Sequence, residues 1–115
     1  MTTNNNTQEK KCLPCSEIGN VMELDIITHA LTELHPDWTL LEKPQHTIKR
    51  SFSFQGYRQA MMFANAVAWI ADSQDHHPDM LITYNQVDVR FTTHELGGIT
   101  QNDFICASEV DRLCH

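Results

Sequence analysis

The sequence predicts a single α+β domain, a four-stranded antiparallel sheet with three helices packed on one face. The length of 115 residues suits about one domain. Hydrophobic residues make up 41% and charged residues 20%, a balance that can bury a core. Two candidate strand pairs alternate with segments of helical spacing, in the order helix, strand, strand, helix, strand, strand, helix. Hairpins separated by helices favour an antiparallel sheet that the helices cover.

The first three elements lie before residue 55. Apolar residues after Val21 recur at spacings of three and four and predict a helix that Pro36 ends. Two strands follow, Trp38–Glu42 and Thr47–Phe54, and the turn between them contains Pro44. We expect these strands to form a hairpin. The buried face of the helix is predicted to carry Leu24, Ile27, Ala30, Leu31 and Leu34.

The clearest helical pattern covers Gln55–Ala71, where small alanines would let a sheet approach closely. A second strand pair, Leu81–Tyr84 and Val87–Thr93, flanks a turn at Asn85 and Gln86. Apolar and polar residues alternate along the later strand. One face of the sheet is therefore expected to meet water, on the side of Asp88, Arg90 and Thr92.

The last helix is predicted to begin near Thr100, after the break at Gly97 and Gly98. Asp103 stands three residues after Thr100, the spacing of a capping box, and we assign it that structural role. The expected apolar face of this helix consists of Cys106, Val110 and Leu113.

Residues 1–17 are predicted to be a flexible arm and residues 18–115 the folded domain, because the polar stretch Thr2–Lys11 offers nothing to pack. Cys12 and Cys15 have the spacing of half a zinc knuckle or of a redox pair. No second close pair of ligands accompanies them, nor do the strand and helix that a redox motif needs. We therefore assign these thiols no role.

The net charge of the chain limits the classes of partner that it is expected to bind. Eight basic against fifteen acidic residues leave a formal charge of −7, which repels phosphate backbones and anionic membranes. No apolar run approaches the roughly 20 residues that span a bilayer. The stretch Met1–Lys11 is polar where a secretory signal would be apolar. We expect a soluble, cytoplasmic protein that binds neither nucleic acid nor membrane.

Candidate chemistry gathers in the run Asp75–Pro78, with His94 at the end of the last strand. A proline disfavours helical geometry in the preceding residue, so the second helix should end near His76, with two adjacent imidazoles at its carboxyl end. The helix dipole, with Asp72 and Asp75, would raise the pKa of these imidazoles from about 6.5 toward neutrality. The sheet can bring His94 beside this helix end, so that one pocket holds all three histidines.

Other roles are open to the same residues. Any one of the histidines alone is more often a helix cap or a solvated surface residue than a catalytic one. Three histidines with a carboxylate could also ligate zinc. Adjacent histidines rarely face one ion, however, and metal-binding helices space them three or four apart, so proton transfer is favoured. Nucleophilic catalysis is weaker still, because neither Ser73 nor a cysteine has an activating context.

Several of these motifs together resemble the pterin-4a-carbinolamine dehydratase family. They are Asp75-His76-His77-Pro78, Tyr84, Thr92-Thr93-His94, Gly97-Gly98-Ile99-Thr100 and Asp103-Phe104. The resemblance extends over nearly the whole folded part, including Pro36-Asp37-Trp38, Phe54 with Ala60, and the arm at Cys12-Leu-Pro-Cys15. It implies the α+β fold and a homodimer that pairs edge strands, or a homotetramer built from two such dimers.

The resemblance also implies an activity, the dehydration of 4a-hydroxytetrahydropterin to quinonoid dihydropterin in the recycling that follows aromatic amino acid hydroxylation. His76, His77 and His94 align with the family's three active-site histidines. We expect His76 and His94 to be the acid and base pair, in an order left open, and His77 to orient the pterin. General acid and base catalysis needs neither metal nor organic cofactor here.

The remaining expected site residues flank these histidines. Asp75, Pro78, Thr93, Glu95 and Leu96 are expected to bind the pterin, and Asp72 to bias the histidines' protonation. Family members often have a Glu where this chain has Asp72, a shorter carboxylate. Animal relatives also serve as dimerisation partners of a homeodomain transcription factor. A non-catalytic protein-binding module is therefore the alternative function.

Overall fold

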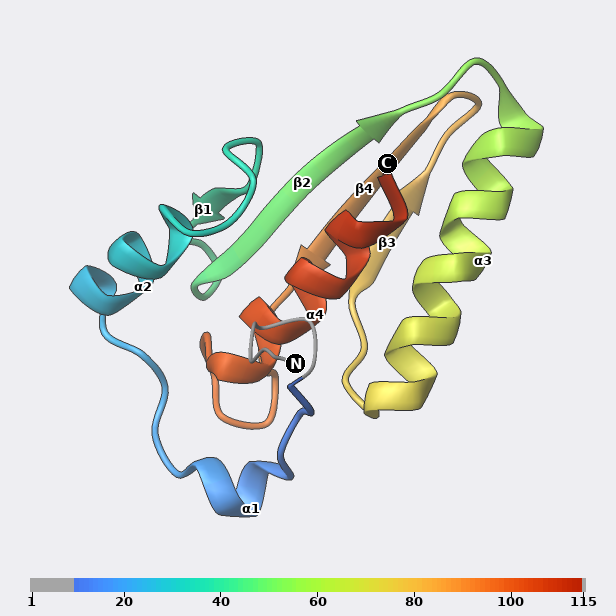
Figure 1. The fold of residues 1–115 in the computed structure, drawn as a ribbon. Helices are drawn as coiled ribbons and strands as arrows, with labels where there is room; N and C mark the ends of the chain where they lie inside the picture. The colour runs from blue at the N-terminus through green and yellow to red at the C-terminus, as the bar shows by residue number, and fades with distance from the viewer. Residues whose placement is uncertain (1–9, 115) are drawn as a thin grey trace, which may run out of the picture.

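The computed structural model describes residues 10–114 and confirms the predicted α+β class (Figure 1). One antiparallel sheet has the strand order β1-β2-β4-β3. In Figure 1, α4 crosses in front of the sheet, α3 lies to its right and α2 lies beside β1. The main elements are α2 (Leu24–Leu31), β1 (Thr39–Leu41), β2 (Thr47–Ser53), α3 (Tyr57–Gln74), β3 (Asp79–Ile82), β4 (Gln86–Phe91) and α4 (Gln101–Asp111). Two shorter ones are α1 (Cys15–Ile18) and a 3-10 turn (Arg112–Cys114).

The two central strands, β2 and β4, carry the alternation that the sequence predicts. Ile48 pairs with Phe91 and Phe52 with Val87, and all four side chains are buried on the helix side of the sheet. On the opposite side, Lys49 Nζ lies 3.8 Å from a carboxylate oxygen of Asp88. Because alternate residues of a strand face opposite sides, this register places Lys49 and Asp88 away from the helices. Asp88 is nevertheless buried, so this face meets water less than predicted. Arg50 lies on the helix side, where its Nη1 donates to Asp111 Oδ1 at 2.8 Å.

The core lies between the sheet and the helices. Ala60, Ala64 and Val67 form the inner face of α3, and their small size lets this helix approach the strands closely. Burial of each large aliphatic side chain stabilises the fold by about 1.5–3 kcal/mol. α2 contributes only Ile27 as a fully buried residue, while α4 brings Phe104, Cys106 and Val110 among others.

Several predicted boundaries were wrong. α2 begins at Leu24 because the N–H of Met22, just before it, bonds the carbonyl of Ile99 at 2.7 Å in a non-helical segment. β3 begins two residues before Leu81, immediately after the proline, and a Thr83-to-Gln86 hydrogen bond closes the turn that follows it. At the other end of the chain, Leu113 does not continue the apolar face of α4, because the helix ends at Asp111 and leaves this side chain 40% exposed.

The predicted arm is described only in part. Residues 1–9 lie outside the described range. The stretch that follows includes α1, which the sequence analysis did not predict, and Cys12 packs against the core. The division at residue 17 stays a prediction. None of the helices within residues 10–114 is long and apolar enough to cross a membrane.

Candidate active site

The end of α3 orients the two adjacent histidines differently. Asp75 adopts the left-handed conformation, with φ 52°, which is uncommon for a residue other than glycine and ends the helix. The N–H of His76 still bonds the carbonyl of Ala71 at 3.2 Å, so its side chain turns inward and is buried. His77 is exposed. The prediction that the helix ends near His76 is confirmed.

The start of α4 supplies a buried carboxylate. Asp103 is fully buried and forms the predicted capping box with Thr100, whose N–H donates to Asp103 Oδ2 at 2.9 Å. The same oxygen accepts a hydrogen bond from the Thr93 hydroxyl at 2.8 Å. The other carboxylate oxygen, Oδ1, remains free to bind a group outside the helix.

That group is His76, whose Nε2 lies 2.6 Å from Asp103 Oδ1. The carboxylate accepts, so Nε2 carries the proton in this hydrogen bond. The second ring nitrogen, Nδ1, has no hydrogen-bond partner among residues 10–114. This nitrogen is thus the one available to a bound molecule. Sequence spacing indicates only the capping role of Asp103. The one sequence feature that could have indicated a further role is its place in the motif Asp103-Phe104, which resembles the family.

The pairing changes the protonation of His76. Burial alone would lower its pKa, but the hydrogen bond and the negative charge of Asp103 outweigh burial and raise it. Cys12 and Asp75 add smaller contributions of the same sign. The predicted rise in the pKa of His76 is therefore confirmed. The main cause of the rise is Asp103, and Asp72 is not among the groups that raise this pKa.

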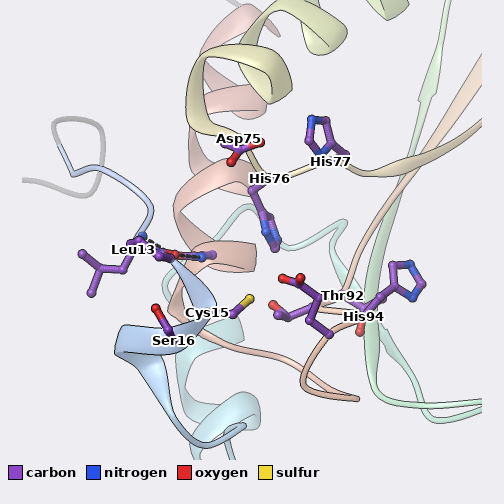
Figure 2. A pocket seen from close by; sticks show the side chains of 12 residues that line it. Leu13, Cys15, Ser16, Asp75, His76, His77, Thr92 and His94 are labelled. Carbon is purple, nitrogen blue, oxygen red and sulfur yellow. Dashed lines mark hydrogen bonds between the residues drawn. The ribbon is translucent and has the colours of Figure 1, made fainter.

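A pocket of about 610 Å³ lies beside this pair, and all three predicted histidines line it. Figure 2 shows residues of the arm, among them Cys15 and Ser16, on one side, with His77 and His94 on the other and His76 between them. Other lining residues named by the sequence analysis are Asp75, Thr93 and Glu95; Pro78, Leu96 and Asp72 do not line the pocket. Five residues that no sequence pattern indicated also line the pocket: Leu13, Pro14, Cys15, Ser16 and Asn102.

His94 stands at the open edge of this pocket. Thr93, just before it, bridges to Gly98 across a tight turn, so the side chain of His94 projects from the end of the β4 segment. Its Nε2 lies 3.5 Å from Asp79 Oδ2, and both side chains are well exposed, at 65% and 72%. Water reaches His94 freely.

The site differs from a metal centre in its arrangement. Within residues 10–114, no three His, Cys, Asp or Glu side chains are grouped closely enough to hold an ion. The buried imidazole instead binds a carboxylate, and the exposed imidazoles stand at the edge. Imidazoles arranged in this way can donate and accept protons within one pocket.

The fold and the site define a small α+β protein with a pocket lined by one buried and two exposed histidines. Residues 20–113 match the family model described as "Pterin 4 alpha carbinolamine dehydratase". The chain belongs to this family.

Curated relatives are similar in sequence to this chain over most of their length. A protein of Nitrosomonas eutropha is 44% identical over 105 residues, 91% of this chain and 90% of the relative. One of Legionella pneumophila (strain Lens) is 43% identical over 104 residues, 90% and 91% of the two chains. Both carry the name "Putative pterin-4-alpha-carbinolamine dehydratase".

Solved structures share the fold. A transcriptional coactivator/pterin dehydratase from Brucella melitensis is 30% identical with a TM-score of 0.77, covering 84% of this chain and all of that one. A pterin dehydratase-like protein identified as a RuBisCO assembly factor in the alpha-carboxysome is 24% identical with a TM-score of 0.58, covering 69% and 90%. The second likeness shows the fold alone.

Proposed function

We propose that the protein dehydrates 4a-hydroxytetrahydropterin to quinonoid dihydropterin by histidine general acid and base catalysis, in tetrahydropterin recycling. Family membership supports the reaction. The observation that carries the mechanism is the buried His76–Asp103 pair beside a pocket that His77 and His94 also line.

In the proposed mechanism, His76 is the acid. Hydroxide is a poor leaving group, so the 4a oxygen must be protonated as its bond to carbon breaks and a ring nitrogen lone pair forms the new double bond. Asp103 holds Nε2–H of His76 and raises its pKa, which favours the charged imidazole, whose Nδ1–H then donates to the leaving oxygen. His94, exposed at the edge, accepts the proton that the ring nitrogen loses. Water is the second product.

The other residues hold the pterin between these groups. His77 orients the substrate. Asp75, Thr93 and Glu95 line the same pocket, which supports the proposal that they bind the polar edge of the pterin. Three further residues act through the backbone. Pro78 fixes the chain after His77, the N–H of Leu96 bonds the carbonyl of Thr93 at 3.1 Å, and the carbonyl of Asp72 accepts from the N–H of Asp75 at 3.2 Å. No step of this mechanism calls for a metal or an organic cofactor.

The test is the decay of 4a-hydroxytetrahydropterin generated by an aromatic amino acid hydroxylase. We expect the full-length protein to accelerate this decay, and His76→Ala or His94→Ala to reduce the rate at least about tenfold, within the range of a proton-transfer residue. His29→Ala is the matched control, because its side chain is 80% exposed on α2, which contributes no residue to the pocket. Full activity of both site variants, with circular dichroism showing that they fold, would reject the mechanism.

A second candidate is a protein-binding module without catalysis. The Brucella melitensis structure, named as a transcriptional coactivator as well as a pterin dehydratase, favours keeping it. The two functions separate in the same assay. A folded protein that does not accelerate the decay, yet recovers a specific partner in a pull-down that His76→Ala leaves intact, would replace the enzymatic proposal.

We also propose that the protein forms a homodimer or homotetramer. β3 is an edge strand of the sheet, and Leu81 on it is 60% exposed, with Tyr84 just beyond it 69% exposed. Unpaired edges that present apolar side chains favour pairing with a second copy. Light scattering on the purified protein measures the state, and a monomer at micromolar concentration would reject this proposal.

A further inference from the structure

Two cysteines far apart in the sequence meet beside the pocket. Cys12 comes from the arm and Cys106 from the middle of α4, and their sulfur atoms are 3.6 Å apart. Cys106 is fully buried, whereas Cys12 is half-buried. All four cysteines, including Cys15 and Cys114, are free thiols in this structure.

Hydrogen bonds hold the arm in the position that brings Cys12 beside Cys106. The side-chain amide of Asn102 accepts from the N–H of Leu13 at 3.0 Å and donates to the carbonyl of the same residue at 2.7 Å. The N–H of Cys12 donates to Gln74 Oε1 at 2.8 Å. The arm is therefore attached to α4 and to the end of α3, and the residues after Cys12 form one wall of the pocket.

We propose that Cys12 and Cys106 are a redox site that forms a reversible disulfide and fixes this wall to α4. A disulfide needs its sulfur atoms about 2.0 Å apart, so the two must approach by roughly 1.6 Å. The arm is a surface segment with one turn of helix, and it can supply that movement. The proposal does not depend on the pterin reaction.

The oxidant is a low-molecular-weight disulfide such as oxidised glutathione. The Cys12 thiolate attacks one of its sulfur atoms and expels one thiolate, which forms a mixed disulfide. The Cys106 thiol then loses its proton and attacks Cys12 Sγ, and the second small thiolate leaves. Two protein thiols are oxidised, and one small disulfide is reduced to two thiols.

The surroundings favour this order of attack. The hydrogen bond from Cys106 and the positive charge of His76 lower the pKa of Cys12 despite burial, so the less buried of the two thiols is the one more readily ionised. The adjacent Cys12 is the main cause that raises the pKa of Cys106, followed by burial. Once Cys12 is in the mixed disulfide its charge is gone, and Cys106 is freer to ionise and react.

The test incubates the reduced full-length protein with oxidised glutathione, blocks the remaining thiols with an alkylating agent, and maps the peptides by mass spectrometry. We expect a Cys12–Cys106 linkage that dithiothreitol reverses. Cys15→Ser and Cys114→Ser are matched controls that should still form it. Cys106→Ser should instead accumulate the glutathione mixed disulfide on Cys12, because no thiol is left to resolve it.

Three outcomes would overturn the proposal. One is a linkage between Cys12 and Cys15, which lie three residues apart. Another is a disulfide between chains through Cys114 in place of the Cys12–Cys106 linkage. The last is an unchanged Cys12–Cys106 pair under conditions that modify Cys15. Because Cys106 is buried, Cys12→Ser is the variant that tests the pair with the least change to the core, and it should show no intramolecular linkage.

Discussion

Two histidines that line the same pocket, His76 and His94, each pair with a carboxylate, and the two pairs differ in distance and in exposure to water. His76 and Asp103 are 2.6 Å apart with side chains 9% and 0% exposed. His94 and Asp79 are 3.5 Å apart with side chains 65% and 72% exposed. Water screens the electrostatic attraction between His94 and Asp79, whereas the attraction between His76 and Asp103 is not screened. Only the buried pair can therefore stabilise a charged imidazole strongly. Burial, more than the identity of the residues, decides what each histidine can do.

Removing the buried charge should have the largest effect. Asp103→Asn keeps the shape of the side chain but leaves His76 without its anionic partner and weakens the cap of α4. We expect the free energy of unfolding to fall by about 3 kcal/mol, as when one member of a buried pair is lost. Urea denaturation measures it. An unchanged midpoint would show that the pair adds nothing to stability.

The same variant should change the titration of His76. In the native protein Asp103 raises the pKa of His76 against the opposing effect of burial. With the carboxylate gone, burial dominates and the pKa of His76 should fall below its ordinary value. Nuclear magnetic resonance of the imidazole protons at a series of pH values follows this directly. A pKa that stays raised in Asp103→Asn would assign the effect to another group.

The free energy of unfolding should depend on pH through the raised pKa of His76. The pKa of His76 is higher in the folded protein than in the unfolded chain, where it is about 6.5. Protonated His76 therefore stabilises the fold fully below about pH 6.5, and this contribution is lost as pH rises through the folded pKa. We expect the difference in unfolding free energy between the native protein and Asp103→Asn to shrink over that range. A difference that grows with pH would contradict the assignment.

The exposed pair should give the smallest effect. Asp79→Asn is expected to lower the free energy of unfolding by less than about 1 kcal/mol, the range of surface pairs. In about 1 M salt, where the screening length is about 3 Å, that difference should disappear while the effect of Asp103→Asn persists. Denaturation at low and high salt compares the two. Equal salt sensitivity would mean that the pairs do not differ as their burial indicates.

Much of the fold could be predicted because its signals are local. Alternation along Val87–Thr93 identified the core strand, and the capping spacing located the start of α4 at Thr100. Helix and strand ends were less accurate. The contact from Met22 to Ile99 that delays α2 joins residues far apart in the sequence, and no local pattern shows it.

The site divides in the same manner. The proline after His77 indicated where the helix ends, and the family-like motifs named the histidines that line the pocket. The partner of His76 could not be found from spacing, because Asp103 lies 27 residues further on and already had a local explanation as a cap. Cys12 and Cys106 are 94 residues apart, and only the fold brings them together.

Asp103 couples the beginning of a helix to the charge of an imidazole. One carboxylate oxygen accepts a hydrogen bond in the first turn of α4, and the other binds His76. A change in the position of Asp103 therefore alters both the helix cap and the charge of the imidazole. An insertion or deletion in the loop before Thr100 would move both oxygens together. The length of this partly exposed loop therefore matters to the chemistry of the pocket, because a shift there would misplace the proton on His76.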